Sequence, residues 1–410
     1  MPLSPPLTTS HFNFVLPRAR RYMAQMNINA LVLTKAEDIY YFTAIASFFS
    51  YQFKPSPSSI IILYRDDSIP TSIILNEFEA ASTQIALPTY DLFTFPVWVD
   101  VDDPSDLTSE LSERPIDAPI ELMLKQLQKA LSKAGFSTGV IGIDSQSLVK
   151  THYDLFHSVL ENYQITDTKL LLNHVRMIKS ELEIQLLTRA AQITETGINE
   201  AINKLDVNVS HAELVNAYQK GIHQFHDSQN SRFHIISIAE HFSPIYHPSG
   251  IKTKMGDLIK FDCGVEVRGY GADLARTAIL GEPTKQIANL YDIILQSHLA
   301  MLDEIKPGLS MSKLFKDGIE RIRKLGLKRY NRGHFGHSTG VSLALEEYPF
   351  ISEQSDACFE SNMVMCVETP YYGKGIGAIM IEDMIRITST GIELLSHNPR
   401  TLTIVTPSTT

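Results

Sequence analysis

The stretch Leu258-Ile-Lys-Phe-Asp262-Cys-Gly-Val-Glu-Val-Arg-Gly-Tyr-Gly-Ala-Asp273-Leu-Ala-Arg-Thr277 decides the fold of this chain. Apolar residues at both ends, with glycines between them, predict a β-hairpin with strands at 257–264 and 272–280. The segment therefore belongs to a sheet, and each strand carries one aspartate.

The turn of this hairpin sets how the two aspartates meet. With a turn centred near Val267 and Arg268, Asp262 and Asp273 face each other across the ladder, with Cβ atoms about 5 Å apart. Facing carboxylates repel each other unless a cation lies between them. The hairpin therefore predicts half of a metal site, with a solvated hairpin carrying surface acids as the alternative.

Three further candidate ligands follow along the chain. His337 comes after Gly336, Glu368 ends the apolar run Met363–Val367, and Glu382 lies in an alternating strand pattern at 379–387. Taken alone, a glutamate such as Glu382 could pair with an arginine instead, because a buried carboxylate needs some partner. The full set of five ligands, four of them carboxylates, suits two hard divalent ions and hydrolytic chemistry.

Size and charge narrow the class of protein. A chain of 410 residues predicts two domains, and the net charge of -10 makes nucleic acid and anionic membranes unsuitable partners. The three cysteines show no metal-ligand spacing and fit a reducing compartment. The N-terminus does not read as a signal peptide and no apolar run is long enough to span a membrane, so we expect a cytoplasmic protein.

Residues 1–172 are predicted to form an α/β domain, because short apolar strands alternate with helical spacing. The strands are expected at 30–33, 59–64, 71–75 and 139–144, with a helix at 120–134.

Residues 173–410 are predicted to form an α+β domain. Ser180 as N-cap and Glu183 three residues later make a capping box at the start of a long helix. Further helices are expected at 213–226, 290–305 and 311–325, and further strands at 233–239, 362–368 and 377–388.

Residues from about 176 to 395 resemble the pita-bread metallopeptidases, the family of methionine aminopeptidase, aminopeptidase P, prolidase and creatinase. The resemblance is carried by Arg176-Met-Ile-Lys-Ser-Glu181, Asp262–Thr277, Gly336-His337, Val364–Pro370, Ile381-Glu382-Asp383 and Gly391–Leu395. The segment Asp38-Ile-Tyr-Tyr-Phe-Thr43 resembles the smaller N-terminal domain that prolidase, aminopeptidase P and creatinase have. The resemblance implies a catalytic pita-bread domain over 173–410 and a creatinase/prolidase-like domain over 1–172.

The resemblance also implies how the ligands share two ions. Asp262 binds one metal, Asp273 and Glu382 bridge both, and His337 and Glu368 complete the site of the other. Carboxylate-rich coordination favours Mn(II), with Co(II), Fe(II) and Zn(II) as alternatives. A homodimer is expected from the family alone.

The implied mechanism is attack on an amide carbonyl by a hydroxide that bridges the two metals. Glu368 is the expected general base. His247 resembles a family histidine that contacts the substrate, with a surface-loop histidine as the alternative interpretation. Arg276, in the pattern Asp-x-x-Arg-Thr, is expected to orient metal ligands.

The surroundings of the ligands depart from the family pattern. Glu346 stands where a second catalytic histidine is expected, beside Glu347, and His334 is a candidate substitute for that histidine. Met380 replaces an arginine that prolidases and aminopeptidases P usually have two residues before the last metal glutamate. Because the metal ligands are retained while the residues around them differ, the sequence favours an enzyme with a different substrate over an inactive enzyme.

Three functions remain open at this point. The first is an Xaa-Pro peptidase, either a dipeptidase or an aminopeptidase, with Arg332 and Tyr371 as further candidate substrate contacts. The second is a creatinase-like or ectoine-hydrolase-like hydrolase or lyase acting on a small non-peptide compound. The third is a non-catalytic peptide-binding module, which the five retained ligands disfavour.

Overall fold

The computed structural model describes residues 9–52, 57–101, 105, 113–117, 119–226, 230–243, 250–341 and 346–408. The chain divides into two compact units, Thr9–Val175 and Arg176–Thr410.

The N-terminal unit contains a six-stranded mixed sheet with strand order β4-β3-β2-β1-β5-β6. The pairs β1–β2 and β2–β3 are antiparallel, and the pairs β3–β4, β1–β5 and β5–β6 are parallel. The strands are β1 (Ala30–Leu33), β2 (Ile60–Tyr64), β3 (Ser72–Asn76), β4 (Asp91–Phe95), β5 (Gly139–Ile143) and β6 (Tyr163–Asp167). The helices are α1 (Thr9–Gln25), α2 (Ala36–Thr43), α3 (Phe48–Gln52), α4 (Glu77–Ala86), α5 (Ile120–Lys133), α6 (Lys150–Val159), α7 (Lys169–Arg176) and the short 3₁₀ helix η1 (Ser145–Ser147).

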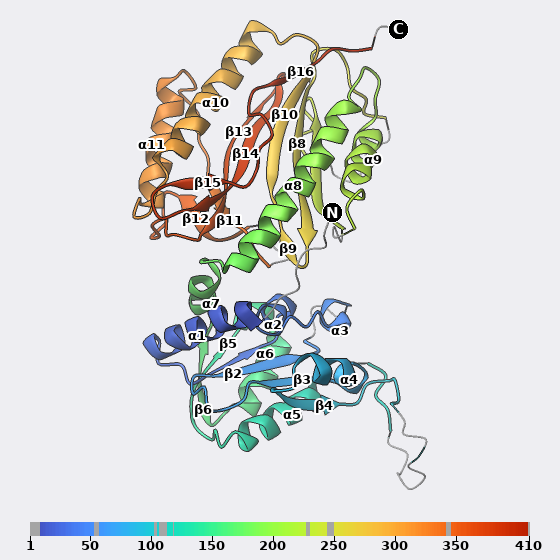
Figure 1. Cartoon of the computed structure of the whole chain (residues 1–410), viewed down its shortest axis with the longest axis vertical. Coiled ribbons are helices and arrows are strands. Elements are labelled where there is room, and N and C mark those ends of the chain that lie inside the picture. Colours follow the sequence, from blue (N-terminus) through green and yellow to red (C-terminus); the bar gives the residue numbers. More distant parts are fainter. Residues whose placement is uncertain are drawn as a thin grey trace. The chain divides into compact units, whose positions relative to one another are not determined.

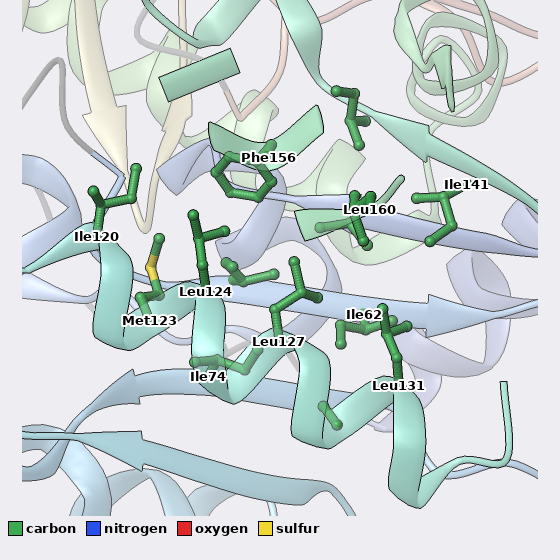
Figure 2. Close-up of a cluster of buried hydrophobic side chains, with 14 of the residues drawn as sticks. Ile62, Ile74, Ile120, Met123, Leu124, Leu127, Leu131, Ile141, Phe156 and Leu160 are labelled. Carbon is green, nitrogen blue, oxygen red and sulfur yellow. The ribbon is translucent and has the colours of Figure 1, made fainter. Parts of the chain in front are cut away.

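The core of this unit lies between the sheet and α5. Figure 2 shows apolar side chains of α5, among them Leu124 and Leu127, pointing toward Ile62 and Ile74 of the sheet. The helix buries these residues because they recur at helical spacing on one face. Each fully buried side chain contributes about 1.5–3 kcal/mol, so burial of this face stabilises the unit.

The C-terminal unit contains a ten-stranded sheet whose main path is β12-β11-β13-β14-β10-β8-β7, with β15 paired to β14, β16 to β10 and β9 to β8. The strands are β7 (Asn230–Ile238), β8 (Leu258–Val267), β9 (Tyr270–Gly271), β10 (Leu274–Leu280), β11 (His334–Ser338), β12 (Glu347–Ser352), β13 (Val364–Gly373), β14 (Gly377–Ile387), β15 (Ile392–Leu394) and β16 (Thr403–Val405).

Two helix pairs cover different parts of this sheet. Helices α8 (Glu181–Asn203) and α9 (His211–Ile222) contact β7, β8 and β10, whereas α10 (Lys285–Glu304) and α11 (Met311–Lys324) contact β12, β13 and β14 (Figure 1). The predicted capping box at Ser180 and Glu183 is present at the start of α8, with both reciprocal hydrogen bonds. The predicted fold class, an α/β domain followed by a pita-bread α+β domain, is confirmed.

The register of the aspartate hairpin differs from the prediction. Asp262 pairs with Ala275, not with Asp273. The turn is centred on Arg268 and Gly269, with φ of 51° and 81°, because two-residue hairpin turns need positive φ at both central positions and β-branched Val267 resists it. The shift is two residues, so the two aspartates still share one face of the sheet.

Among the described residues, no helix combines the length and the apolar character that crossing a lipid bilayer requires.

Candidate metal centre

Four neighbouring strands bring three of the predicted ligands into one row. Asp262 on β8 pairs with Ala275 on β10, and Ala275 pairs with Glu382 on β14. Glu382 in turn pairs with Glu368 on β13. Directly opposed residues point to the same face, and the small Ala275 side chain leaves room between the carboxylates on either side of it.

Asp273, immediately before β10, and His337, on β11, complete the cluster. A carboxylate oxygen from each of Asp262, Asp273 and Glu382 lies within 4.8 Å of the other two. The Nε2 atom of His337 is 3.6 Å from Asp273 Oδ2 and 3.9 Å from Glu382 Oε1. Ligands bound to one ion at about 2.0–2.2 Å are themselves about 3–4 Å apart. The cluster therefore has spacings close to those of ligands that share a cation.

The five side chains are buried, with at most 8% of each residue exposed. Asp273 Oδ1 and Glu382 Oε2 are buried and have no hydrogen-bond partner among the described residues. An unsatisfied buried polar atom costs about 1–3 kcal/mol, and more when charged. A divalent cation would satisfy both oxygens at once, so the residues present fit the metal that this donor set predicts.

The electrostatics of the cluster agree with this fit. Burial, together with neighbouring carboxylates, raises the pKa of Asp273 and of Glu382 well above their usual values. Burial also raises the pKa of Asp262, although Lys260 opposes the shift. Carboxylates of this kind ionise when a cation supplies the missing positive charge.

His337 is prepared as a neutral ligand. Burial lowers its pKa, and its Nδ1 donates a hydrogen bond of 2.9 Å to the Ser338 carbonyl, which leaves the Nε2 lone pair for a metal. The preceding Gly336 has φ of 143°, and a Cβ atom there would lie 2.0 Å from the Cys366 carbonyl oxygen. Glycine is therefore required at position 336, so that β11 can approach β13 next to His337.

A buried polar network supports the strand that bears Glu382. Arg276 donates to the Glu382 carbonyl at 2.7 Å and to Asp383 Oδ1 at 2.6 Å. His298 and Arg400 contact Asp383 Oδ2 at 2.8 and 2.5 Å. Burial opposes ionisation of Asp383, but Arg276 and these neighbours outweigh it and hold its pKa well below the usual range. Arg276 thus contacts the backbone of a candidate ligand, as an orienting residue does.

Glu368 lies beside a second group of polar residues. Its Oε2 forms an ion pair with Arg332, and its Oε1 is 3.3 Å from Nδ1 of His334. The other ring nitrogen of His334 is 3.7 Å from Oε2 of Glu346. Glu346 is exposed, so His334 lies between an exposed and a buried carboxylate.

The remaining predicted site residues are placed less centrally. Glu347 forms an ion pair of 2.6 Å with Arg176 and does not join the ligand cluster. Met380 is buried with its Sδ 4.0 Å from the Tyr372 hydroxyl, and Tyr371 is half-buried. His247 lies outside the described residues.

Sequence reasoning missed two residues of the cluster. The ammonium of Lys260 lies 2.8 Å from Asp262 Oδ2 and 3.4 Å from the Tyr372 hydroxyl. Burial favours the neutral lysine, but Asp262 and Tyr372 outweigh it and raise its pKa, so the group is a cation. Cys366 lies among the ligands on β13. Each residue comes two positions before a predicted ligand, and the two-residue period of a strand was the signal that could have found it.

Comparison with known families decides the class. The model for metallopeptidase family M24 matches residues 185–389, half of the chain, and includes all five candidate ligands. The chain belongs to metallopeptidase family M24. The N-terminal part, residues 16–178, matches the creatinase/prolidase N-terminal domain. Membership of the M24 family implies binding of divalent metal, as the donor set does.

Relatives and solved structures agree with the M24 assignment. An uncharacterized peptidase of Staphylococcus aureus (strain USA300) is 30% identical over 232 residues, which are 56% of this chain and 66% of the relative. Xaa-Pro dipeptidase from Bacillus anthracis has a TM-score of 0.78 at 21% identity, covering 96% of this chain and 100% of that one. Dipeptidase PepE from Mycobacterium ulcerans has a TM-score of 0.79 at 20% identity, covering 98% and 100%. At these identities the structures establish that the fold is shared.

Proposed function

We propose that this M24 protein is a dinuclear-metal-dependent peptidase that hydrolyses Xaa-Pro peptides, as a dipeptidase or an aminopeptidase. The observation that carries the proposal is the convergence of three carboxylates and one neutral imidazole, with Glu368 paired to Glu382 on the next strand and with buried oxygens that have no partner among the described residues. Structures of an Xaa-Pro dipeptidase and an X-Pro aminopeptidase share the fold over nearly the whole chain, which supports the substrate class.

In this proposal the five residues divide between two ions. Asp262 would hold one ion, His337 and Glu368 would hold the other, and Asp273 and Glu382 would contribute to both positions. When bound, the ions would polarise the amide carbonyl of the substrate and activate water for attack. The all-oxygen position at Asp262 and Asp273 suits Mn(II) among the divalent metals.

The chain's own contribution to proton transfer centres on Glu368. Its Oε1 takes up the proton that the attacking water loses, and Arg332 holds the other carboxylate oxygen in place. His334, with Nδ1 3.3 Å from Oε1, carries the proton to the leaving amine. Glu346, near the other nitrogen of this ring, keeps the imidazole oriented and so contributes to the function of the missing second histidine.

The test is turnover of a defined panel by protein of measured metal content. Xaa-Pro dipeptides, Xaa-Pro-Xaa tripeptides and matched peptides with alanine in place of proline are compared after loading with Mn(II) or Co(II). We expect cleavage of prolyl peptides, and a loss of at least about 1000-fold in kcat in Glu382→Gln, because electrostatic stabilisation of this kind contributes several kcal/mol.

The control is Glu393→Gln, which removes an exposed strand carboxylate outside the cluster. Absence of turnover on the whole panel at full metal occupancy refutes the peptidase proposal. Turnover confined to small non-peptide amides or ureas would assign the creatinase-like alternative instead. The expected homodimer stays a prediction, which light scattering tests.

A further inference from the structure

Cys366 lies on the ligand-bearing face of β13. It precedes Glu368 by two residues, so both side chains point to the same face of the sheet. In the adjacent strand it pairs directly with His337, and opposed side chains on neighbouring strands have Cβ atoms about 4.5–5.5 Å apart. The thiol is fully buried. Strand geometry therefore directs it toward the metal centre and away from the helices.

The thiol, an imidazole nitrogen and a carboxylate oxygen form a compact triangle. Cys366 Sγ, a ring nitrogen of His337 and an oxygen of Glu382 all lie within 4.8 Å of one another. Bound to one ion with a metal–sulfur distance of about 2.3 Å and metal–nitrogen and metal–oxygen distances of about 2.0–2.2 Å, the three atoms would be about 3–4 Å apart. Closing by about 1 Å is within the reach of side-chain rotation.

A second observation points to a ligand at the same place. Glu382 is 1% exposed, and its Oε2 atom is buried without a hydrogen-bond partner among the described residues. On the opposite side of the cluster, Asp262 already receives the Lys260 ammonium. The carboxylate of Glu382, one oxygen of which is 3.9 Å from Nε2 of His337, therefore has unsatisfied acceptor capacity beside the imidazole and the sulfur.

We propose that Cys366 is a metal ligand, which makes the two metal positions chemically different. The position at His337 and Glu382 has a nitrogen, oxygen and sulfur donor set and selects Zn(II), Co(II) or Fe(II) over Mn(II), because thiolate is a soft ligand. The position at Asp262 and Asp273 has only oxygen donors. On binding, the metal–sulfur bond forms and the thiol proton passes to solvent. The inference depends on the metal centre of the proposed function but not on its substrate.

Cobalt substitution tests this directly, because a thiolate bound to Co(II) gives a sulfur-to-metal charge-transfer band in the near ultraviolet. Metal-free protein is titrated with Co(II), and its absorbance is compared with that of Cys366→Ser and Cys263→Ser. Cys263 is the matched control, because it is also buried and next to a candidate ligand, but it adjoins Asp262 in sequence and so points to the opposite face of the strand.

We expect the band at the first equivalent of Co(II) in the natural protein and in Cys263→Ser, and its absence in Cys366→Ser. We also expect the ratio of Co(II) to Mn(II) affinity at the first site to fall by at least about tenfold in Cys366→Ser. Cys366→Ala gives the same readout if the serine variant does not fold.

Co(II) binding without the band in the natural protein, or a band that survives in both Cys366 variants, overturns the assignment. In that case the cysteine is only a small core residue. Failure of Co(II) to bind at all overturns both this assignment and the metal centre, whereas a protein that shows the band but cleaves no peptide refutes only the proposed substrate.

Discussion

The ion pair between Lys260 and Asp262 makes a prediction about metal affinity that does not depend on catalysis. The ammonium of Lys260 is 2.8 Å from Asp262 Oδ2, and the two side chains are 2% and 11% exposed. Solvent therefore screens the pair weakly. A metal that takes Asp262 as a ligand must displace this bond, so the lysine acts as an internal competitor. Replacing it with methionine, of similar length and without charge, should tighten binding at the Asp262 position.

The size of the effect follows from the bond that is lost. A hydrogen bond between charged groups contributes about 1.5–3 kcal/mol net. Each 1.4 kcal/mol corresponds to a tenfold change in affinity. Lys260→Met should therefore bind the ion at Asp262 about 10- to 100-fold more tightly, and leave the position at His337 nearly unchanged, since Lys260 lies on the other side of the cluster.

Isothermal titration calorimetry of metal-free protein with Co(II) measures both steps. We expect a tight and a weak step in the natural protein, and two steps of more similar affinity in Lys260→Met. Lys260→Arg, which keeps the positive charge, is the matched control and should retain the weak step. If Lys260→Met folds but its weaker step is unchanged or weakened, the competition argument is refuted.

Three further predictions concern the supports of the site. Asp383→Ala leaves Arg276 and Arg400 without their buried partner and should cost about 3–5 kcal/mol in denaturant unfolding. Burial lowers the pKa of His298, so below about pH 6.5 the unfolded chain binds a proton that the folded protein does not. Stability should then decrease as the pH falls from about 7 to 5, and less steeply in His298→Gln. Gly336→Ala should cost at least about 1–3 kcal/mol in thermal unfolding and weaken the first metal step in calorimetry, because of the positive φ and the contact with β13.

Each of these has an outcome that contradicts it. A decrease of less than about 1 kcal/mol in the free energy of unfolding of Asp383→Ala would mean that the network stabilises the protein no more than a surface ion pair does. If stability depends on pH equally in the natural protein and in His298→Gln, protonation of this histidine does not cause the loss of stability at low pH. Unaltered metal binding in Gly336→Ala would show that the backbone conformation at residue 336 does not determine the position of His337.

The elements that could be predicted from the sequence are those with a clear period. The alternation around Glu382 and the capping box at Ser180 each have a short-range physical cause, and both elements are present. The hairpin was also recognised, but its register was wrong by two residues. Register depends on which residues accept positive φ, and Gly269 accepts it more readily than the β-branched Val267.

The surroundings of the ligands were harder to predict, because they depend on pairing between distant segments. The sequence pattern does not predict Lys260 and Cys366 as site residues, although each shares a face with a predicted ligand. The ion pair of Glu347 with Arg176 joins residues far apart in the sequence, and no local pattern indicates it. Burial and charge in such places are set by the assembled sheet, which a single strand pattern does not contain.

The distribution of the ligands along the chain has a consequence for assembly. Asp262 and Asp273 precede α10, whereas His337, Glu368 and Glu382 follow α11. A backbone cut between β10 and α10 would give two fragments, each with an incomplete donor set. Mixing the fragments with Co(II) would restore the full set only when the two halves of the sheet reassociate, and a chelator would oppose that reassociation. The ion would then link the two fragments non-covalently, and the absorbance of bound Co(II) would measure their association.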